Sequence, residues 1–106
     1  MYENGKIYMG LADGARVELA LNMCNRHGLI AGASGTGKTI TMKVMAESFS
    51  DAGVPVFLCD VKGDVAGICA PGVSSEGMEK RIDKFGLRDR FVYQGYPTTF
   101  WDCLLY

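Results

Sequence analysis

The sequence predicts an α/β fold, an incomplete parallel-sheet core preceded by an N-terminal β-hairpin. Short apolar runs alternate along the chain with stretches of helical periodicity, which is the order of elements in a parallel sheet with right-handed crossovers. A glycine-rich loop at residues 32–39 separates one apolar run from one helical stretch. With 106 residues, the chain fits one small domain or a piece of a larger one. We divide it into a hairpin unit, residues 1–22, and a core unit, residues 23–106.

The first predicted element is the β-hairpin. Residues 6–21 alternate between apolar and polar side chains around Asp13-Gly14, a pair typical of tight hairpin turns. The apolar runs at residues 27–32 and 54–60 then predict two strands covered on both faces.

Two helices separate the predicted strands. Residues 38–51 carry Ile40, Val44 and Phe49 at helical spacing, and Gly53 is a natural terminator. A second helix over about 76–85 is indicated by three spaced apolar residues, a serine cap and a terminal glycine. These are Met78, Ile82 and Phe85, Ser74 or Ser75, and Gly86. Residues 90–94 and 98–106 predict further strands, split by Gly95 and Pro97.

Composition and charge exclude several classes of protein. The chain is 48% hydrophobic and 22% charged, as globular proteins are. A net charge of -1 argues against binding nucleic acid through a bulk positive field. No run approaches the ~18 apolar residues of a membrane span, and residues 1–10 lack the pattern of a signal peptide. We expect a cytoplasmic protein with no membrane partner.

The cysteines do not indicate a metal site. None of the four falls in a C-x-x-C pair, and His27 is not at ligand spacing from any of them. Free thiols in a reducing compartment are the better interpretation. The cysteines are Cys24, Cys59, Cys69 and Cys103.

The glycine-rich loop fits the pattern G-x-x-x-x-G-K-[ST] at every fixed position. Its residues are Gly32, Ala33, Ser34, Gly35, Thr36, Gly37, Lys38 and Thr39. Glycines let the backbone wrap so that successive N–H groups converge on one anion, and the following helix points its positive end at the same place. Lys38 is placed to bind the β- and γ-phosphates as the catalytic cation, and Thr39 to coordinate Mg²⁺. The loop therefore predicts binding of ATP with Mg²⁺, whereas a plain connecting turn would not explain Lys38 and Thr39. The sequence shows no base-reading motif.

Asp60 ends the second predicted strand, at the edge of the sheet where the glycine loop is expected. Two interpretations compete. Asp60 is a carboxylate of the Mg²⁺ site, or it caps a turn with Lys62, Gly63 and Asp64. The next residue is Val61, so the glutamate that activates water in Asp-Glu ATPases is absent at this position.

The runs "NRHGLIAGASGTGKT" and "DVKGDVAGI" resemble the HerA/FtsK-type P-loop ATPases, and most closely the bacterial HerA-like helicase branch. The resemblance covers roughly residues 22–72, the N-terminal part of such an ATPase. It implies a RecA-like core, a hexameric ring, and movement of DNA driven by ATP. His27 matches the family as well. It is interpreted as a strand-start residue hydrogen-bonded to a loop, with nucleotide contact as the alternative.

The chain departs from the family pattern by its length. Members continue for hundreds of residues, through a later strand ending in Asp-Glu, a polar sensor and a trans-acting arginine, and this chain stops at Tyr106. We expect ATPase activity in an intact parent protein and little in this chain alone. Two alternatives stay open: a nucleotide-binding fragment without hydrolysis, and a small phosphotransferase that uses Asp60.

Residues 79–90 are the remaining candidate for DNA contact. Five cations cluster there with interleaved acids, and a solvated face of mixed sign is the preferred interpretation. The cations are Lys80, Arg81, Lys84, Arg88 and Arg90, and the acids are Glu79, Asp83 and Asp89.

Overall fold

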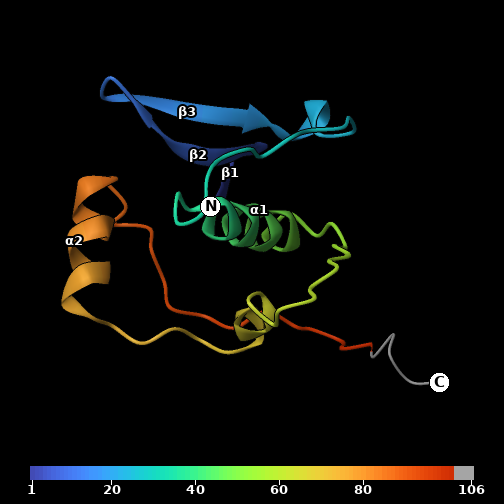
Figure 1. Cartoon of the computed structure of the whole chain (residues 1–106). Coiled ribbons are helices and arrows are strands. Elements are labelled where there is room, and N and C mark those ends of the chain that lie inside the picture. The colour runs from blue at the N-terminus through green and yellow to red at the C-terminus, as the bar shows by residue number, and fades with distance from the viewer. Residues whose placement is uncertain (102–106) are drawn as a thin grey trace.

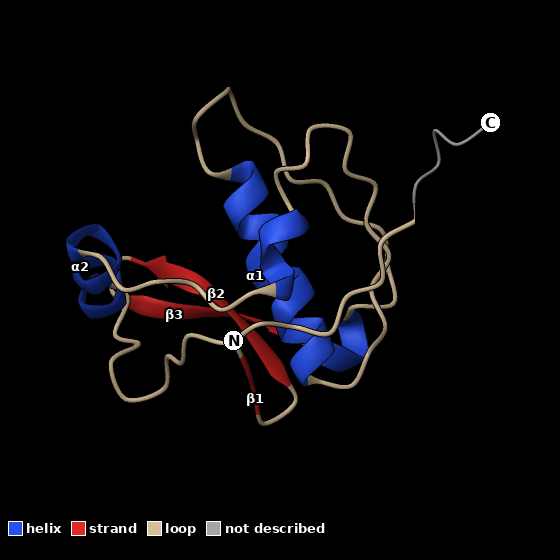
Figure 2. Ribbon diagram, turned by 90° about the horizontal axis from the view of Figure 1, so that it is seen from below, coloured by secondary structure: helices blue, strands red, loops and turns tan. Residues whose placement is uncertain are grey.

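A computed structural model describes residues 1–101 and contains a three-stranded antiparallel sheet in the order β1-β2-β3. The strands are β1 (Tyr2–Glu3), β2 (Lys6–Ala12) and β3 (Ala15–Ala20). The sheet lies over the helix α1 (Lys38–Asp51), and the helix α2 (Glu76–Lys84) lies beside both (Figure 1). Figure 2 shows the same arrangement from below, with long irregular segments around α1.

Two tight turns shape the sheet. Asp13 and Gly14 have φ angles of 50° and 78°, the left-handed pair that a two-residue hairpin needs, and they join β2 to β3 as the sequence predicts. Asn4 and Gly5, with φ angles of 50° and 75°, form an equivalent turn between β1 and β2. We did not predict this strand β1, although the Asn-Gly pair is the signal that could have found it.

Helix α1 has the predicted bounds, and its apolar stripe is only partly buried. It follows Gly37 and ends before Gly53, which has a φ of 78°. Ala46 and Ser48 are its buried residues, whereas Ile40 is 52% exposed. The reason is that, among the helices and strands, α1 packs mainly against β2 and β1, so its other side stays partly uncovered.

Helix α2 forms where its caps predict it. The Ser75 side chain accepts a hydrogen bond from the Met78 amide at 3.2 Å, and Gly86 follows the helix with a φ of 65°. Its Ile82 is buried. The C-cap residue, Phe85, accepts a hydrogen bond through its carbonyl from the Tyr8 hydroxyl at 3.0 Å, which ties α2 to β2.

The hydrophobic core is small. It consists of Ile7 and Tyr8 from β2, Ala46 from α1, Val65 from the loop after residue 60, and Ile82 from α2. No helix in residues 1–101 combines the length and the apolar character that crossing a bilayer requires.

The segment after residue 90 returns to α1 and to the short 3-10 helix η2 (Ala66–Cys69). The Tyr96 amide donates to the Ile68 carbonyl at 3.0 Å, and the Tyr96 hydroxyl donates to Asp51 at 3.2 Å. Gly95 passes so close to η2 that a Cβ there would lie 2.6 Å from the Cys69 carbonyl oxygen. Only glycine fits this crossing without a backbone shift.

The four predicted core strands are irregular within residues 1–101, and residues 102–106 of the last one lie outside the described part. Their apolar side chains are largely exposed: Leu29 by 89%, Phe57 by 75% and Val92 by 68%. A strand covered on both faces needs paired strands on each side, and these segments pair with no strand in the described chain. The parallel-sheet core therefore stays a prediction.

Candidate functional site

The glycine loop forms a turn that leads directly into α1. Gly35 and Gly37 have φ angles of 77° and 96°, in the left-handed region that favours glycine. Between them, the Thr36 amide lies 3.4 Å from the Ala33 carbonyl oxygen, which closes a turn of four residues. Helix α1 then begins at Lys38. Gly35 and Gly37 thus take backbone conformations that other residues rarely adopt.

Two side chains of the loop converge on one carbonyl. The Lys38 ammonium donates to the Ala33 oxygen at 2.7 Å, and the Thr36 hydroxyl donates to the same oxygen at 2.7 Å. Lys38 therefore folds back across the loop instead of extending into solvent. This contact keeps the ammonium beside the backbone that the sequence predicts to hold an anion.

Gly32 leaves room for one of these side chains. A Cβ at this position would lie 2.5 Å from the Thr36 hydroxyl oxygen and 3.6 Å from Cγ of Lys38. The first glycine of the pattern is thus explained by contact inside the loop, while its own φ angle is ordinary. Ser34, the remaining loop residue, is exposed.

The N-terminal end of α1 carries no side-chain cap. Gly37 is the N-cap residue and has no side chain, and the first turn contains no acidic residue. The first helical hydrogen bond runs from the Thr41 amide to the Gly37 carbonyl at 2.9 Å. Backbone N–H groups before it, including that of Thr39, have no intrahelical partner. The helix dipole adds partial positive charge at this end, so the arrangement suits an anion.

Asp60 lies in a different environment. Its Oδ1 accepts hydrogen bonds from the amides of Gly63 and Asp64 at 3.0 and 3.1 Å, and its Oδ2 accepts one from Val65 at 2.9 Å. These bonds, that from Val65 first, hold the pKa of the carboxyl below its ordinary value. Of the two interpretations of Asp60, the geometry favours the turn cap.

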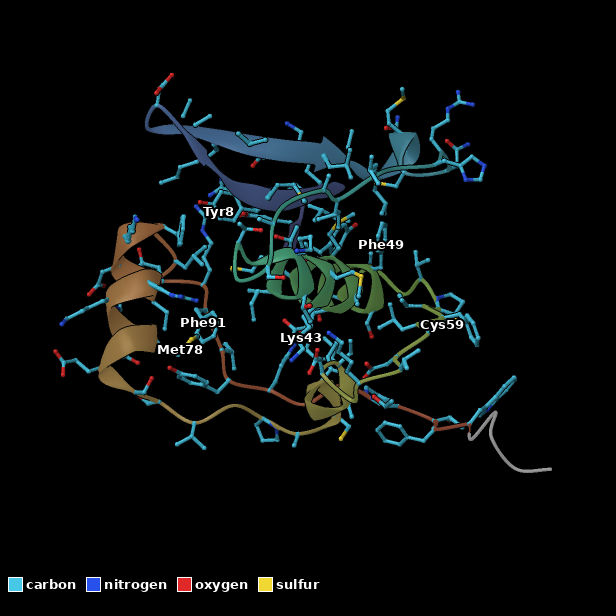
Figure 3. The ribbon with its side chains drawn as sticks, viewed as in Figure 1. Tyr8, Lys43, Phe49, Cys59, Met78 and Phe91 are labelled. Carbon is cyan, nitrogen blue, oxygen red and sulfur yellow. The ribbon has the colours of Figure 1, made fainter. Side chains whose placement is uncertain are left out.

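The structure does not bring Asp60 beside the glycine loop. The segment that carries Cys59 and Asp60 lies toward the C-terminal end of α1, whereas the loop leads into its N-terminal end (Figures 1 and 3). Within residues 1–101, no group of three histidine, cysteine, aspartate or glutamate side chains is arranged to hold a metal ion. Thr39 is half-buried at the start of the helix.

His27 and the cysteines lie apart from these groups. His27 is exposed in the irregular segment before the loop, and its side chain makes no hydrogen bond among the described residues. Cys24, Cys59 and Cys69 are free thiols. Cys103 lies outside the described residues.

The basic segment at residues 79–90 is largely neutralised by ion pairs. Arg88 pairs with both Glu79 and Asp83, which raises the pKa of its guanidinium and lowers those of the two carboxyls. Lys80 pairs with Glu76 at 2.6 Å, and Arg90 pairs with Glu3 on β1. Three of the five cations therefore support the interpretation as a solvated face of mixed sign.

The sequence placed Thr36 in the nucleotide-binding loop without a role for its side chain, while the structure shows its hydroxyl donating to the Ala33 carbonyl of that loop. A threonine between two glycines, three residues after Ala33, was the available signal. Threonine hydroxyls commonly bond to nearby backbone in turns.

Comparison with known proteins relates this chain to one family. The family model described as helicase HerA-like C-terminal matches residues 7–105, nearly the whole chain. The relationship to HerA-like proteins is thereby supported, although the model describes a C-terminal unit and we had placed the chain at the N-terminal part of the ATPase. No curated protein and no solved structure matches the chain.

Proposed function

Since the chain belongs to the helicase HerA-like C-terminal family, we propose that it binds ATP through residues 32–39 as part of a HerA-like ATP-driven DNA translocase. In this proposal, DNA and a ring of subunits are partners of the full-length protein. Residues 23–106 contribute the first part of its P-loop core.

One observation carries the proposal. The residues that fit the phosphate-binding pattern form a closed turn, with Lys38 folded over it and the uncapped end of α1 directly behind it. Such a turn, followed by a helix N-terminus, is the arrangement in which backbone amides bind phosphate. In the bound state, Lys38 would neutralise charge on the β- and γ-phosphates, and the Thr39 hydroxyl would coordinate Mg²⁺.

A second candidate function is nucleotide binding without hydrolysis by this chain. It is favoured by Asp60, whose two carboxylate oxygens are engaged by backbone amides of its own turn. Hydrolysis would then depend on groups supplied by the rest of the ring. Mg²⁺-ATP binding with no steady-state turnover by the isolated chain is the result that this candidate predicts.

Calorimetric titration of Mg²⁺-ATP into the wild-type chain and into Lys38→Ala tests the binding site. Loss of a charged contact to phosphate should cost on the order of 1.5–3 kcal/mol of binding free energy. The matched control is Lys43→Ala, which removes the same side chain from the same helix beyond its first turn. Equal affinities for wild type and Lys38→Ala, or equal losses in both variants, would reject the assigned site.

A further inference from the structure

We infer that the Thr36 hydroxyl is a positioning group, which holds the loop closed when Lys38 leaves the Ala33 carbonyl for a bound phosphate. The inference rests on the proposed nucleotide binding and assigns Thr36 a side-chain role within it. Three features of the loop support it. Lys38 and Thr36 share the Ala33 carbonyl as acceptor, Gly32 leaves space for the Thr36 hydroxyl, and the backbone around Thr36 bends toward Ala33.

The shared acceptor is the Ala33 carbonyl oxygen. It accepts hydrogen bonds of 2.7 Å from both the Lys38 ammonium and the Thr36 hydroxyl, besides a longer one of 3.4 Å from the Thr36 amide. A bond from an ammonium to phosphate is stronger than a bond to a neutral carbonyl, so a nucleotide draws Lys38 away. The Thr36 hydroxyl then remains the short hydrogen bond on this carbonyl, because the Thr36 amide is 3.4 Å from it.

The space that the Thr36 hydroxyl occupies lies beside Gly32. A Cβ there would meet the Thr36 hydroxyl oxygen at 2.5 Å, and every other atom would be 3.5 Å or more away. The hydroxyl thus occupies the room that glycine leaves at this position. The hydroxyl that bonds the Ala33 carbonyl is thus also the atom that a side chain at position 32 would displace.

The backbone around Thr36 turns the side chain into the loop. Both neighbours are glycines with positive φ angles, 77° at Gly35 and 96° at Gly37, which bend the chain back toward Ala33. A loop of this kind has few other contacts to hold it, because residues 31–36 are exposed. The Thr36 hydroxyl bond to Ala33, the shorter of the two that Thr36 makes to this carbonyl, therefore helps to fix the backbone amides that face a phosphate.

The test is calorimetric titration of Mg²⁺-ATP into the full chain carrying Thr36→Val or Thr36→Ser. Valine keeps the shape and removes the hydroxyl, whereas serine keeps the hydroxyl. The matched control is Thr41→Val, whose hydroxyl donates to the Gly37 carbonyl at 3.1 Å inside α1. We expect about fivefold weaker binding for Thr36→Val, the effect of one neutral hydrogen bond, and affinities within about twofold of wild type for the other two variants.

The outcomes separate the inference from the proposed function. Wild-type protein that does not bind Mg²⁺-ATP rejects the proposed function, and the role of Thr36 with it. Binding by wild type with equal affinity in Thr36→Val, or equal losses in Thr36→Val and Thr36→Ser, overturns the inference alone. Far-UV circular dichroism verifies folding, and if Thr36→Val does not give the wild-type spectrum, Thr36→Ala takes its place with the same expectation.

Discussion

Single side chains determine several turns of this chain through bonds to their own backbone. The Asp60 carboxylate accepts hydrogen bonds from the amides of three successive residues, Gly63 to Val65. Val65 is also one of the few buried apolar residues. The carboxylate thus connects a polar turn to the core. An aspartate at the end of an apolar run can bind a metal ion or cap a turn. Here its partners in the structure are the backbone amides of a turn.

The Asp60 turn should open in acid. A carboxyl with a depressed pKa in the folded state contributes stability above its unfolded pKa and loses it as the pH falls through the folded value. The contribution of Asp60 is therefore complete above its ordinary pKa of 3.8 and is lost below it. Amide hydrogen exchange of Gly63 to Val65, measured as a function of pH, should show protection that disappears in this acidic range.

The same turn can be opened by mutation near neutral pH. Asp60→Asn replaces one acceptor oxygen with a donor, so at least one of the three amides loses its partner and should exchange faster. Asp64→Asn is the matched control, because the Asp64 side chain is exposed and makes no hydrogen bond among the described residues. Unchanged protection in Asp60→Asn would contradict the role of Asp60 as the organiser of this turn.

At the level of elements, local signals account for the hairpin and both helices. The Asp13-Gly14 turn and the alternation around it specify β2 and β3, and Gly53 ends α1. Ser75 starts α2 because its hydroxyl satisfies an amide that the helix leaves unpaired. Each of these features acts within a few residues, so each can be read from a short stretch of sequence.

Removing the cap of α2 should destabilise the chain. We expect Ser75→Ala to lower the free energy of unfolding by about 1 kcal/mol, the usual contribution of a serine N-cap. Urea denaturation followed by circular dichroism measures the change. Ser74→Ala is the control, since the Ser74 hydroxyl donates to the half-buried Glu79 side chain and to no backbone group of the helix, and an equal loss in both variants would argue against the cap.

The molecule as a whole buries little of its apolar surface. Its core contains Ile7, Tyr8, Ala46, Val65 and Ile82, while the apolar segments at residues 27–32 and 54–60 are largely exposed. The Phe57 and Trp101 rings meet edge to face with centroids 6.4 Å apart, yet both remain exposed. Exposed apolar side chains in this number favour association in water.

The isolated chain should therefore associate in a concentration-dependent way. Multi-angle light scattering over a range of concentrations should give a mass that rises above that of the 11.5 kDa monomer. Phe57→Ser should reduce the association, because it removes an exposed aromatic side chain without disturbing the core. A constant monomeric mass for wild type would contradict this expectation.

The candidate site could be predicted in part. Residues 32–39 were identified from glycines, a lysine and a threonine at fixed spacing, since phosphate binding needs these residue types and the sequence shows them directly. The turn capped by Asp60 was one of two interpretations that the sequence left open, and the hydroxyl contact of Thr36 was not specified, because each depends on which backbone groups come within hydrogen-bonding distance. The stripe through Ile40, Val44 and Phe49 is only partly covered, since periodicity gives a face but not the partner that covers it.

By itself, the sequence determined the hairpin turn at Asp13-Gly14, the bounds of α1 and α2, and the glycine loop at the start of α1. These depend on φ preferences, caps and periodicity, which act over a few residues. The tertiary structure alone decided that Ser48 is buried while Ile40 is exposed, that Tyr8 bonds to the end of α2, and that Lys38 and Thr36 share the Ala33 carbonyl. Such contacts join groups through space, and their free energy depends on packing that no short stretch of sequence encodes.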